Sequence, residues 1–163
     1  MAIQTLDASL EKLLQGRNIA TFGTENPDGS IHLTAVWYLF EKGCLFVGTS
    51  SRTRKARNIA ERPKASLMVD VRKPATERGL TAAGKVDVIT GDQSREINHR
   101  IHSRYLSPAA LSDPKVGPVF AAFDDVTLRL TPASWITWDM AMLDAQFFGG
   151  QLGRNAGYML PMD

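Results

Sequence analysis

Seven consecutive residues, 49 to 55, combine four hydroxyl side chains with three basic ones. The hydroxyls belong to Thr49, Ser50, Ser51 and Thr53, and the cations to Arg52, Arg54 and Lys55. Such groups suit a phosphate, because they bind its oxygens through charge-assisted hydrogen bonds. A helix that starts here would add unpaired backbone amides and the positive end of its dipole. The segment therefore predicts a phosphate site, although a solvated surface loop has the same composition.

The elements on either side of this segment favour the first interpretation. Cys44 to Val47 is apolar and rich in β-forming residues, so it predicts a strand. Thr53 to Glu61 predicts a short helix that ends before a proline, and Lys64 to Val71 predicts the next strand. Arg54 and Lys55 would then stand at the start of a helix held between two strands.

The other reactive side chains indicate no catalytic or metal site. His99 and His102 are three residues apart on a predicted helix, but no third ligand forms a motif with them. We therefore expect both on the helix surface, and no metal. Cys44 is the only cysteine, which excludes an intrachain disulfide and a cysteine cluster for zinc. No G-x-S-x-G or G-x-G-x-x-G motif is present, and no residue is an evident general acid or base, so the catalytic residue stays unknown.

Length and composition set the class of protein. A chain of 163 residues suits one domain, or one half of a dimer with shared sites. Hydrophobic residues make up 44% and charged residues 22%, and no apolar run approaches the roughly 20 residues that span a bilayer. The first residues lack the features of a secretory signal, so we expect a cytoplasmic protein that binds no membrane. The net charge of +2, with the cations clustered between Arg52 and Arg62, argues against a nucleic-acid surface.

The pattern of elements predicts an antiparallel β-barrel with peripheral helices, a mainly β fold, in a single domain over residues 1–163. An N-terminal helix occupies residues 1–16, and the tail over residues 140–163 resists assignment. A turn at residues 26–29 and another at 41–43 predict a meander of three consecutive strands. Gly84 predicts a bulge and Pro132 a bend or an edge. The expected strands are Asn18–Thr24, Ser30–Phe40, Cys44–Thr49, Lys64–Val71, Leu80–Thr90 and Val126–Trp138, and the expected later helices are Asp92–Leu106 and a turn within Val116–Phe123.

Over roughly Leu10 to Trp138 the chain resembles the pyridoxamine 5'-phosphate oxidase-like family of flavin-binding split β-barrels, which includes the deazaflavin (F420)-dependent reductases. The resemblance rests on three segments in the family's order: IATFGTENPDGSIHLTAVWYLF, CLFVGTSS and TRKARNIAERPKASLMVD. It implies a homodimer with two cofactor sites at the subunit interface. It also implies that the ring of the bound cofactor performs hydride chemistry on a small-molecule substrate.

The resemblance assigns the cofactor site residue by residue. Arg54 and Lys55 match the positions that grip the cofactor phosphate, with Thr49, Ser50 and Ser51 in the same loop. The strand that borders the ring corresponds to Thr34, Val36 and Trp37.

The resemblance leaves three functions open. We expect an FMN-binding oxidoreductase. The alternatives are an F420-dependent reductase of the same fold and a non-enzymatic flavin- or haem-binding protein. Oxidation of vitamin B6 is disfavoured, because the family's Arg-x-His element is replaced near the C-terminus by Gly153-Arg154-Asn155-Ala156. The sequence does not reveal the substrate.

Overall fold

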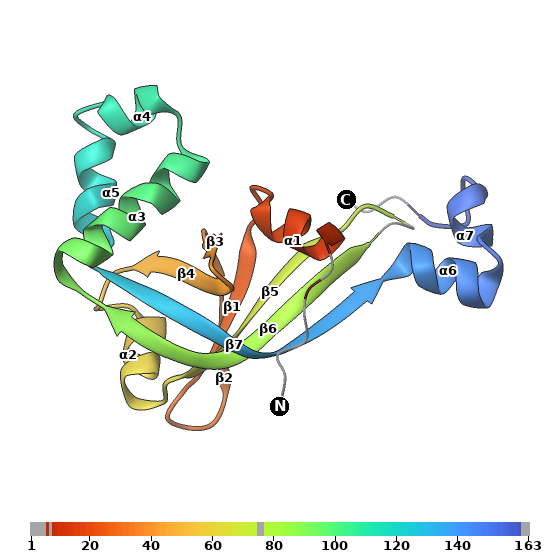
Figure 1. Ribbon diagram of the computed structural model, residues 1–163, viewed down its shortest axis with the longest axis horizontal. Coiled ribbons are helices and arrows are strands. Elements are labelled where there is room, and N and C mark those ends of the chain that lie inside the picture. Colours follow the sequence, from red (N-terminus) through yellow and green to blue (C-terminus); the bar gives the residue numbers. More distant parts are fainter. Residues whose placement is uncertain (1–5, 7, 75–76, 161–163) are drawn as a thin grey trace.

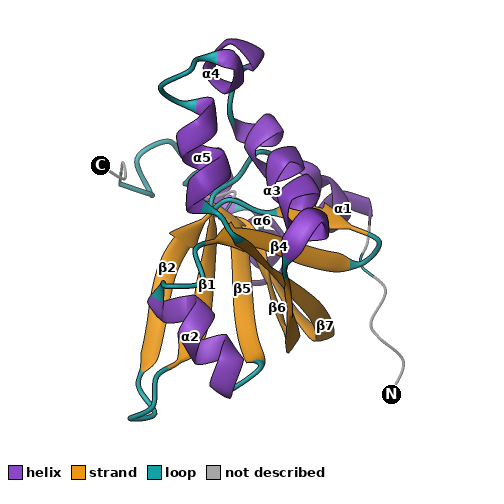
Figure 2. Ribbon diagram, turned by 90° about the vertical axis from the view of Figure 1, so that its left-hand side faces the viewer, coloured by secondary structure: helices purple, strands orange, loops and turns teal. Residues whose placement is uncertain are grey.

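The computed structural model describes residues 6, 8–74 and 77–160, and within this part a single curled sheet of seven strands organises the chain. The sheet order is β2-β1-β5-β6-β7-β4-β3, and every neighbouring pair is antiparallel. Helices lie around it (Figures 1 and 2), which confirms the predicted class of split β-barrel. The elements are α1 (Ala8–Gln15), β1 (Ala20–Glu25), β2 (Ile31–Val36), β3 (Leu39–Glu41), β4 (Cys44–Thr49), α2 (Arg54–Glu61), β5 (Lys64–Val71), β6 (Arg78–Ile89), α3 (Gly91–Tyr105), α4 (Pro108–Ser112), α5 (Gly117–Phe123), β7 (Val126–Asp139), α6 (Met140–Phe148) and α7 (Gln151–Arg154).

The prediction of one strand over Ser30–Phe40 is wrong, and so is the three-strand meander. The chain leaves β2 at Val36 and enters β3 at Leu39, yet these strands are the two outermost members of the sheet. Consecutive Cα atoms are about 3.8 Å apart, so a link of two residues can span no more than about 11 Å. The two edges of the sheet must therefore curl toward each other.

Tyr38 occupies this link and is completely buried. Its hydroxyl donates to the carbonyl of Leu14 at 3.0 Å, which ties the link to the end of α1. The Arg104 guanidinium lies 5.4 Å from the centre of its ring. Burial raises the pKa of the Tyr38 hydroxyl to about 12, so this group stays protonated and donates throughout the ordinary pH range.

The core lies inside the curled sheet. Strands contribute alternate residues to it, as a sheet with one buried face requires. Along β5, for example, Ala65, Leu67 and Val69 are buried. Among the largest fully buried side chains are Leu14, Phe22, Leu67, Leu80, Leu128 and Leu130.

The predicted irregularity at Gly84 is confirmed. The register between β6 and β7 shifts between Ala83 and Gly84, and Gly84 pairs with Pro132. A Cβ atom on Gly84 would lie 2.0 Å from the carbonyl oxygen of Thr131. The pairing of β7 with β4 ends at Leu130. Pro132, which has no backbone N–H, therefore has no residue of β4 opposite it that would need a donor.

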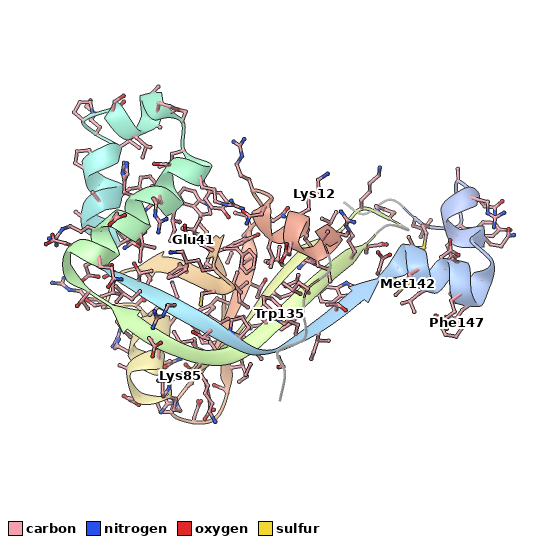
Figure 3. All side chains as sticks on the ribbon, viewed as in Figure 1. Lys12, Glu41, Lys85, Trp135, Met142 and Phe147 are labelled. Carbon is pink, nitrogen blue, oxygen red and sulfur yellow. The ribbon has the colours of Figure 1, made fainter. Side chains whose placement is uncertain are left out.

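The helices from α3 onward occupy opposite ends of the sheet. The contacts among α3, α4 and α5 group them at one end, whereas α6 and α7 lie at the far end of β7 (Figure 1). Met142 and Phe147 on α6 project from that far end (Figure 3) and are largely exposed.

The C-terminal tail over residues 140–163, for which the sequence predicted no element, is helical over two short segments, α6 and α7. Its last three residues, like residues 1–5 of the predicted N-terminal helix, lie outside the described part of the chain. None of the described helices is both long and apolar enough to cross a membrane.

We expect Gly84→Ala to lower the free energy of unfolding by about 2 kcal/mol or more, because the new methyl group collides with a backbone oxygen that cannot move aside. Urea denaturation followed by circular dichroism measures the change. Gly153→Ala is the control, since a Cβ atom there meets only Asp144 Oδ2 at an ordinary 3.4 Å. Equal effects of the two substitutions would contradict the close packing at Gly84.

Candidate functional site

A cavity of about 200 Å³ lies where the end of β4, the start of α2 and the end of β2 meet. Ala35, Val36 and Trp37 form one wall, and another consists of Gly48, Thr49, Ser50, Thr53 and Lys55. Ile101 of α3, Phe123 at the end of α5 and Asp124 directly after it complete the lining. The structure thus brings strand, loop and helix together around one space.

The hydroxyl-rich loop is ordered by its own side chains. Thr53 is the N-cap of α2, and its hydroxyl accepts a hydrogen bond from the Ala56 amide. The same hydroxyl donates to the carbonyl of Ser50 at 2.8 Å. Among the described residues, the backbone amides of Arg54 and Lys55 have no hydrogen-bond acceptor. Two donors and the positive end of the helix dipole therefore remain available at the start of α2.

Asp125 holds the other side of this loop. Its carboxylate accepts hydrogen bonds from the amide and the hydroxyl of Ser51, both at 2.6 Å. These bonds keep the pKa of the Asp125 carboxyl below its ordinary value. Ser51, predicted to contact the phosphate, therefore uses its side chain to fasten the loop to the start of β7.

Lys55 is the half-buried cation of the cavity. Within the described part of the chain its ammonium group makes no hydrogen bond and no ion pair. Burial lowers the pKa of Lys55, and the negative charge of Asp124 partly opposes this effect. A desolvated cation without a partner is stabilised by an anion that enters the cavity, so the residues present fit a phosphate group.

Asp124 and His102 form a pair that the sequence did not predict. His102 Nε2 lies 2.8 Å from Asp124 Oδ2, and His102 is only 3% exposed. The expectation that His102 lies on the helix surface is therefore wrong, whereas His99 is exposed as predicted. His102 is buried because α3 turns this face toward α5 and the Phe120 ring.

Asn98 also holds Asp124 in place. It donates to the Asp124 carbonyl at 2.8 Å and accepts from the Thr127 hydroxyl at 2.7 Å. Gly48 allows this arrangement, because a Cβ atom there would lie 2.9 Å from both Asp124 Oδ2 and Asn98 Oδ1. The adjacent acidic residues before β7 were visible in the sequence, but nothing local indicates that they meet a loop about 70 residues earlier.

Two other rings stack on Trp37. Tyr105 stacks on it at 5.0 Å between ring centres, and Phe120 stacks at 5.5 Å. These contacts hold the indole in place where it lines the cavity. A further groove of about 300 Å³ borders the same strand and shares Ala35, Val36 and Trp37 with the cavity.

The structure gathers most of the predicted cofactor residues, and leaves three outside the cavity. Val36, Trp37, Thr49, Ser50 and Lys55 line it. Thr34, Ser51 and Arg54 do not: Thr34 lies farther along β2, Ser51 binds Asp125, and Arg54 is exposed at the start of α2. Among the described residues, no group of three or more His, Cys, Asp and Glu side chains could hold a metal ion.

A larger concavity, of about 870 Å³, lies on the outer face of the sheet. Ile31 and Leu33 of β2 border it and are 61% and 64% exposed. Small residues such as Gly23 and Ala83 form its floor. Ala35 continues the exposed row of β2 and also lines the cavity, so this face and the cavity adjoin.

Comparison with known proteins gives one family and several solved structures. The family model described as pyridoxamine 5'-phosphate oxidase matches residues 6–139. No curated protein matches the chain.

The similar structures share the fold at low sequence identity. A conserved hypothetical protein, Rv2991 from Mycobacterium tuberculosis, has a TM-score of 0.71 and 23% identity over 86% of this chain and 89% of that one. An F420 reductase has a TM-score of 0.64 and 22% identity over 80% and 98%. HutZ, the haem storage protein from Vibrio cholerae, has a TM-score of 0.63 and 16% identity over 82% and 94%.

We expect Asp125→Asn to destabilise the protein at neutral pH, and this destabilisation to shrink progressively as the pH falls below about 4. The folded-state pKa of Asp125 lies below its unfolded value of about 3.9, so its contribution is present above that value and is lost as the pH falls through the folded pKa. Urea denaturation of both proteins at pH 7 and pH 3 measures the difference.

Glu96→Gln is the control for this prediction, because Glu96 is exposed and has no partner among the described residues. An effect of Asp125→Asn that is the same at both pH values would show that its ionised carboxylate does not fasten the loop.

Proposed function

Since this chain belongs to the pyridoxamine 5'-phosphate oxidase family, we propose that it is a cytoplasmic oxidoreductase that binds FMN and acts on a small molecule. The observation that supports this most is the half-buried Lys55 ammonium, which lacks a partner in a cavity at the start of α2. A phosphate monoester would accept hydrogen bonds from both the Lys55 ammonium and the free amides. Bound flavin supplies the hydride or electron chemistry.

The chain's own residues bind and orient in this proposal. Lys55 and the amides at the start of α2 hold the phosphate, while Thr49 and Ser50 offer hydroxyls in the same cavity. The segment from Ala35 to Trp37 leads from this cavity into the adjoining groove and gives an apolar wall for a ring. Tyr105 and Phe120 fix the Trp37 side chain, so this wall is already formed before a ligand enters.

The second candidate is an F420-dependent reductase. It is supported by the similar structure that is itself an F420 reductase. Both cofactors join a phosphate to a ring through a ribityl chain, so the cavity accepts the anchoring part of either. The similarity to the haem storage protein HutZ keeps a non-enzymatic carrier as the third outcome to be distinguished by experiment.

Titration of the purified protein with FMN, F420 and haem, followed by absorbance and fluorescence, distinguishes the three candidates. We expect FMN to bind most tightly, and the bound flavin to turn over with a reductant and an acceptor. Tighter binding of F420 than of FMN would favour the second candidate, an F420-dependent reductase. Binding without turnover would favour a carrier.

We expect Lys55→Met to weaken FMN binding by about 10- to 100-fold, because it removes a charge-assisted hydrogen bond to the phosphate while keeping the length of the side chain. Lys115→Met is the matched control, since Lys115 is exposed and does not line the cavity. The dissociation constant by fluorescence quenching is the readout. Equal affinity of the two variants for FMN would contradict the proposal that Lys55 binds the phosphate.

We further propose that the protein is a homodimer with a cofactor site at each edge of the subunit interface. The exposed apolar face around Ile31 and Leu33 is the support, because large apolar side chains gathered on one face of a sheet favour contact with another protein surface. A partner on this face would border the cavity next to Ala35. Apart from Glu25, Lys64 and Lys85, the residues that line this face are uncharged and many of them are small, which would allow two copies to approach closely.

We expect Leu33→Asp to convert the dimer to a monomer, because a charge would be buried at the centre of the interface without a partner. Size-exclusion chromatography with light scattering measures the mass. Val119→Asp is the control, since Val119 is a similarly exposed apolar residue on α5, away from this face. A wild-type protein that is monomeric at all concentrations would contradict the proposal.

A further inference from the structure

A carboxylate lies in the cavity that is proposed to bind a phosphate. Asp124 lines the same cavity of about 200 Å³ as Lys55, and its negative charge acts on the Lys55 ammonium. Like charges repel more strongly in a partly desolvated site than in water. Asp124 therefore opposes binding of a bare phosphate, and its presence there calls for a second role.

The position of this carboxylate is built into the fold. His102 Nε2 donates to Asp124 Oδ2 at 2.8 Å, and Asn98 holds the backbone carbonyl of Asp124 at 2.8 Å. Gly48 leaves room for it on the β4 side, where a Cβ atom would come within 2.9 Å of Oδ2. Two residues of α3 and the space left by Gly48 on β4 thus fix Asp124 at the cavity wall.

One oxygen of this carboxylate remains available. Oδ2 accepts the hydrogen bond of the buried His102, whereas Oδ1 has no hydrogen-bond partner in the described part of the chain. The side chain is 20% exposed and lines this cavity as well as a neighbouring one of about 300 Å³ that His99 and His102 border, so small molecules have access to the carboxylate. An ionised carboxylate only accepts hydrogen bonds, so a ligand group that meets Oδ1 must be a donor.

We propose that Asp124 accepts a hydrogen bond from a hydroxyl group of the ligand whose phosphate lies at Lys55, so that the cavity selects polyol phosphates over phosphate itself. This inference rests on the proposed phosphate site and adds the part of the ligand next to the phosphate. A chain with several hydroxyls, linked directly to the phosphate, places a donor beside the anion. Lys55 then pairs with the charge of the phosphate, while Asp124 accepts a hydrogen bond from the hydroxyl.

Binding of two ring-free probes, ribitol phosphate and inorganic phosphate, to the full-length protein tests this inference by calorimetry. In the wild-type protein we expect ribitol phosphate to bind more tightly. In Asp124→Asn we expect inorganic phosphate to bind a few-fold more tightly, because the repulsion is removed. Ribitol phosphate should lose about tenfold or more of its advantage, because a charge-assisted hydrogen bond is lost. An advantage that survives unchanged in Asp124→Asn overturns the role of Asp124.

A second comparison uses the wild-type protein alone and does not depend on how the variant folds. Pentyl phosphate has the same chain length as ribitol phosphate and no hydroxyl groups. We expect it to bind about tenfold more weakly, and equal or tighter binding overturns the inference. If neither inorganic phosphate nor any phosphate ester binds, the proposed phosphate site itself is wrong, and the proposed role of Asp124 is wrong with it.

Asp113→Asn is the control for the Asp124→Asn variant, since Asp113 is an exposed acidic residue between α4 and α5.

Discussion

The short link between β2 and β3 is the constraint on which the site depends. Two residues join the opposite edges of the sheet, so the sheet must curl. Tyr38 makes this geometry stable, because its ring fills the interior and its hydroxyl finds an acceptor at the end of α1. The curl in turn places the strand that ends at Trp37 opposite the loop that follows β4. Without it, the apolar wall and the hydroxyl-rich loop would not border the same cavity.

Local patterns in the sequence predicted the local structure well. The boundaries of β5 match the predicted strand, and α2 begins at Arg54, one residue after the predicted start at Thr53. Hydroxyl and basic residues next to a helix start were enough to indicate the loop, because capping and anion binding depend on neighbouring residues. The bulge at Gly84 followed from the rarity of glycine within strands.

Features that depend on distant parts of the chain were missed. The strand-like pattern over residues 30–40 does not reveal that the residues before Trp37 pair with β1 and those after Tyr38 with β4, because both halves are typical of a strand. The burial of His102 depends on the helices that follow it, and the meeting of Asp124 with Lys55 depends on how β7 pairs with β4. Periodicity in one segment contains no information about such partners. The same is true of Arg54 and Lys55: both are basic, and only the direction of the helix decides which one enters the cavity.

The antiparallel pairing of β4 with β7 has a consequence for how the chain reaches this structure. Leu45 pairs with Leu130, whereas the β1–β2 and β3–β4 pairs join residues that are close in sequence. Short loops close at little entropic cost, and long ones must be closed before their contacts repay it. The two hairpins are therefore the parts that can form early, on either side of Trp37 and Tyr38. The cavity needs β4 and β7 side by side, so it cannot exist before this long-range pairing has formed, and the hairpins alone do not create it.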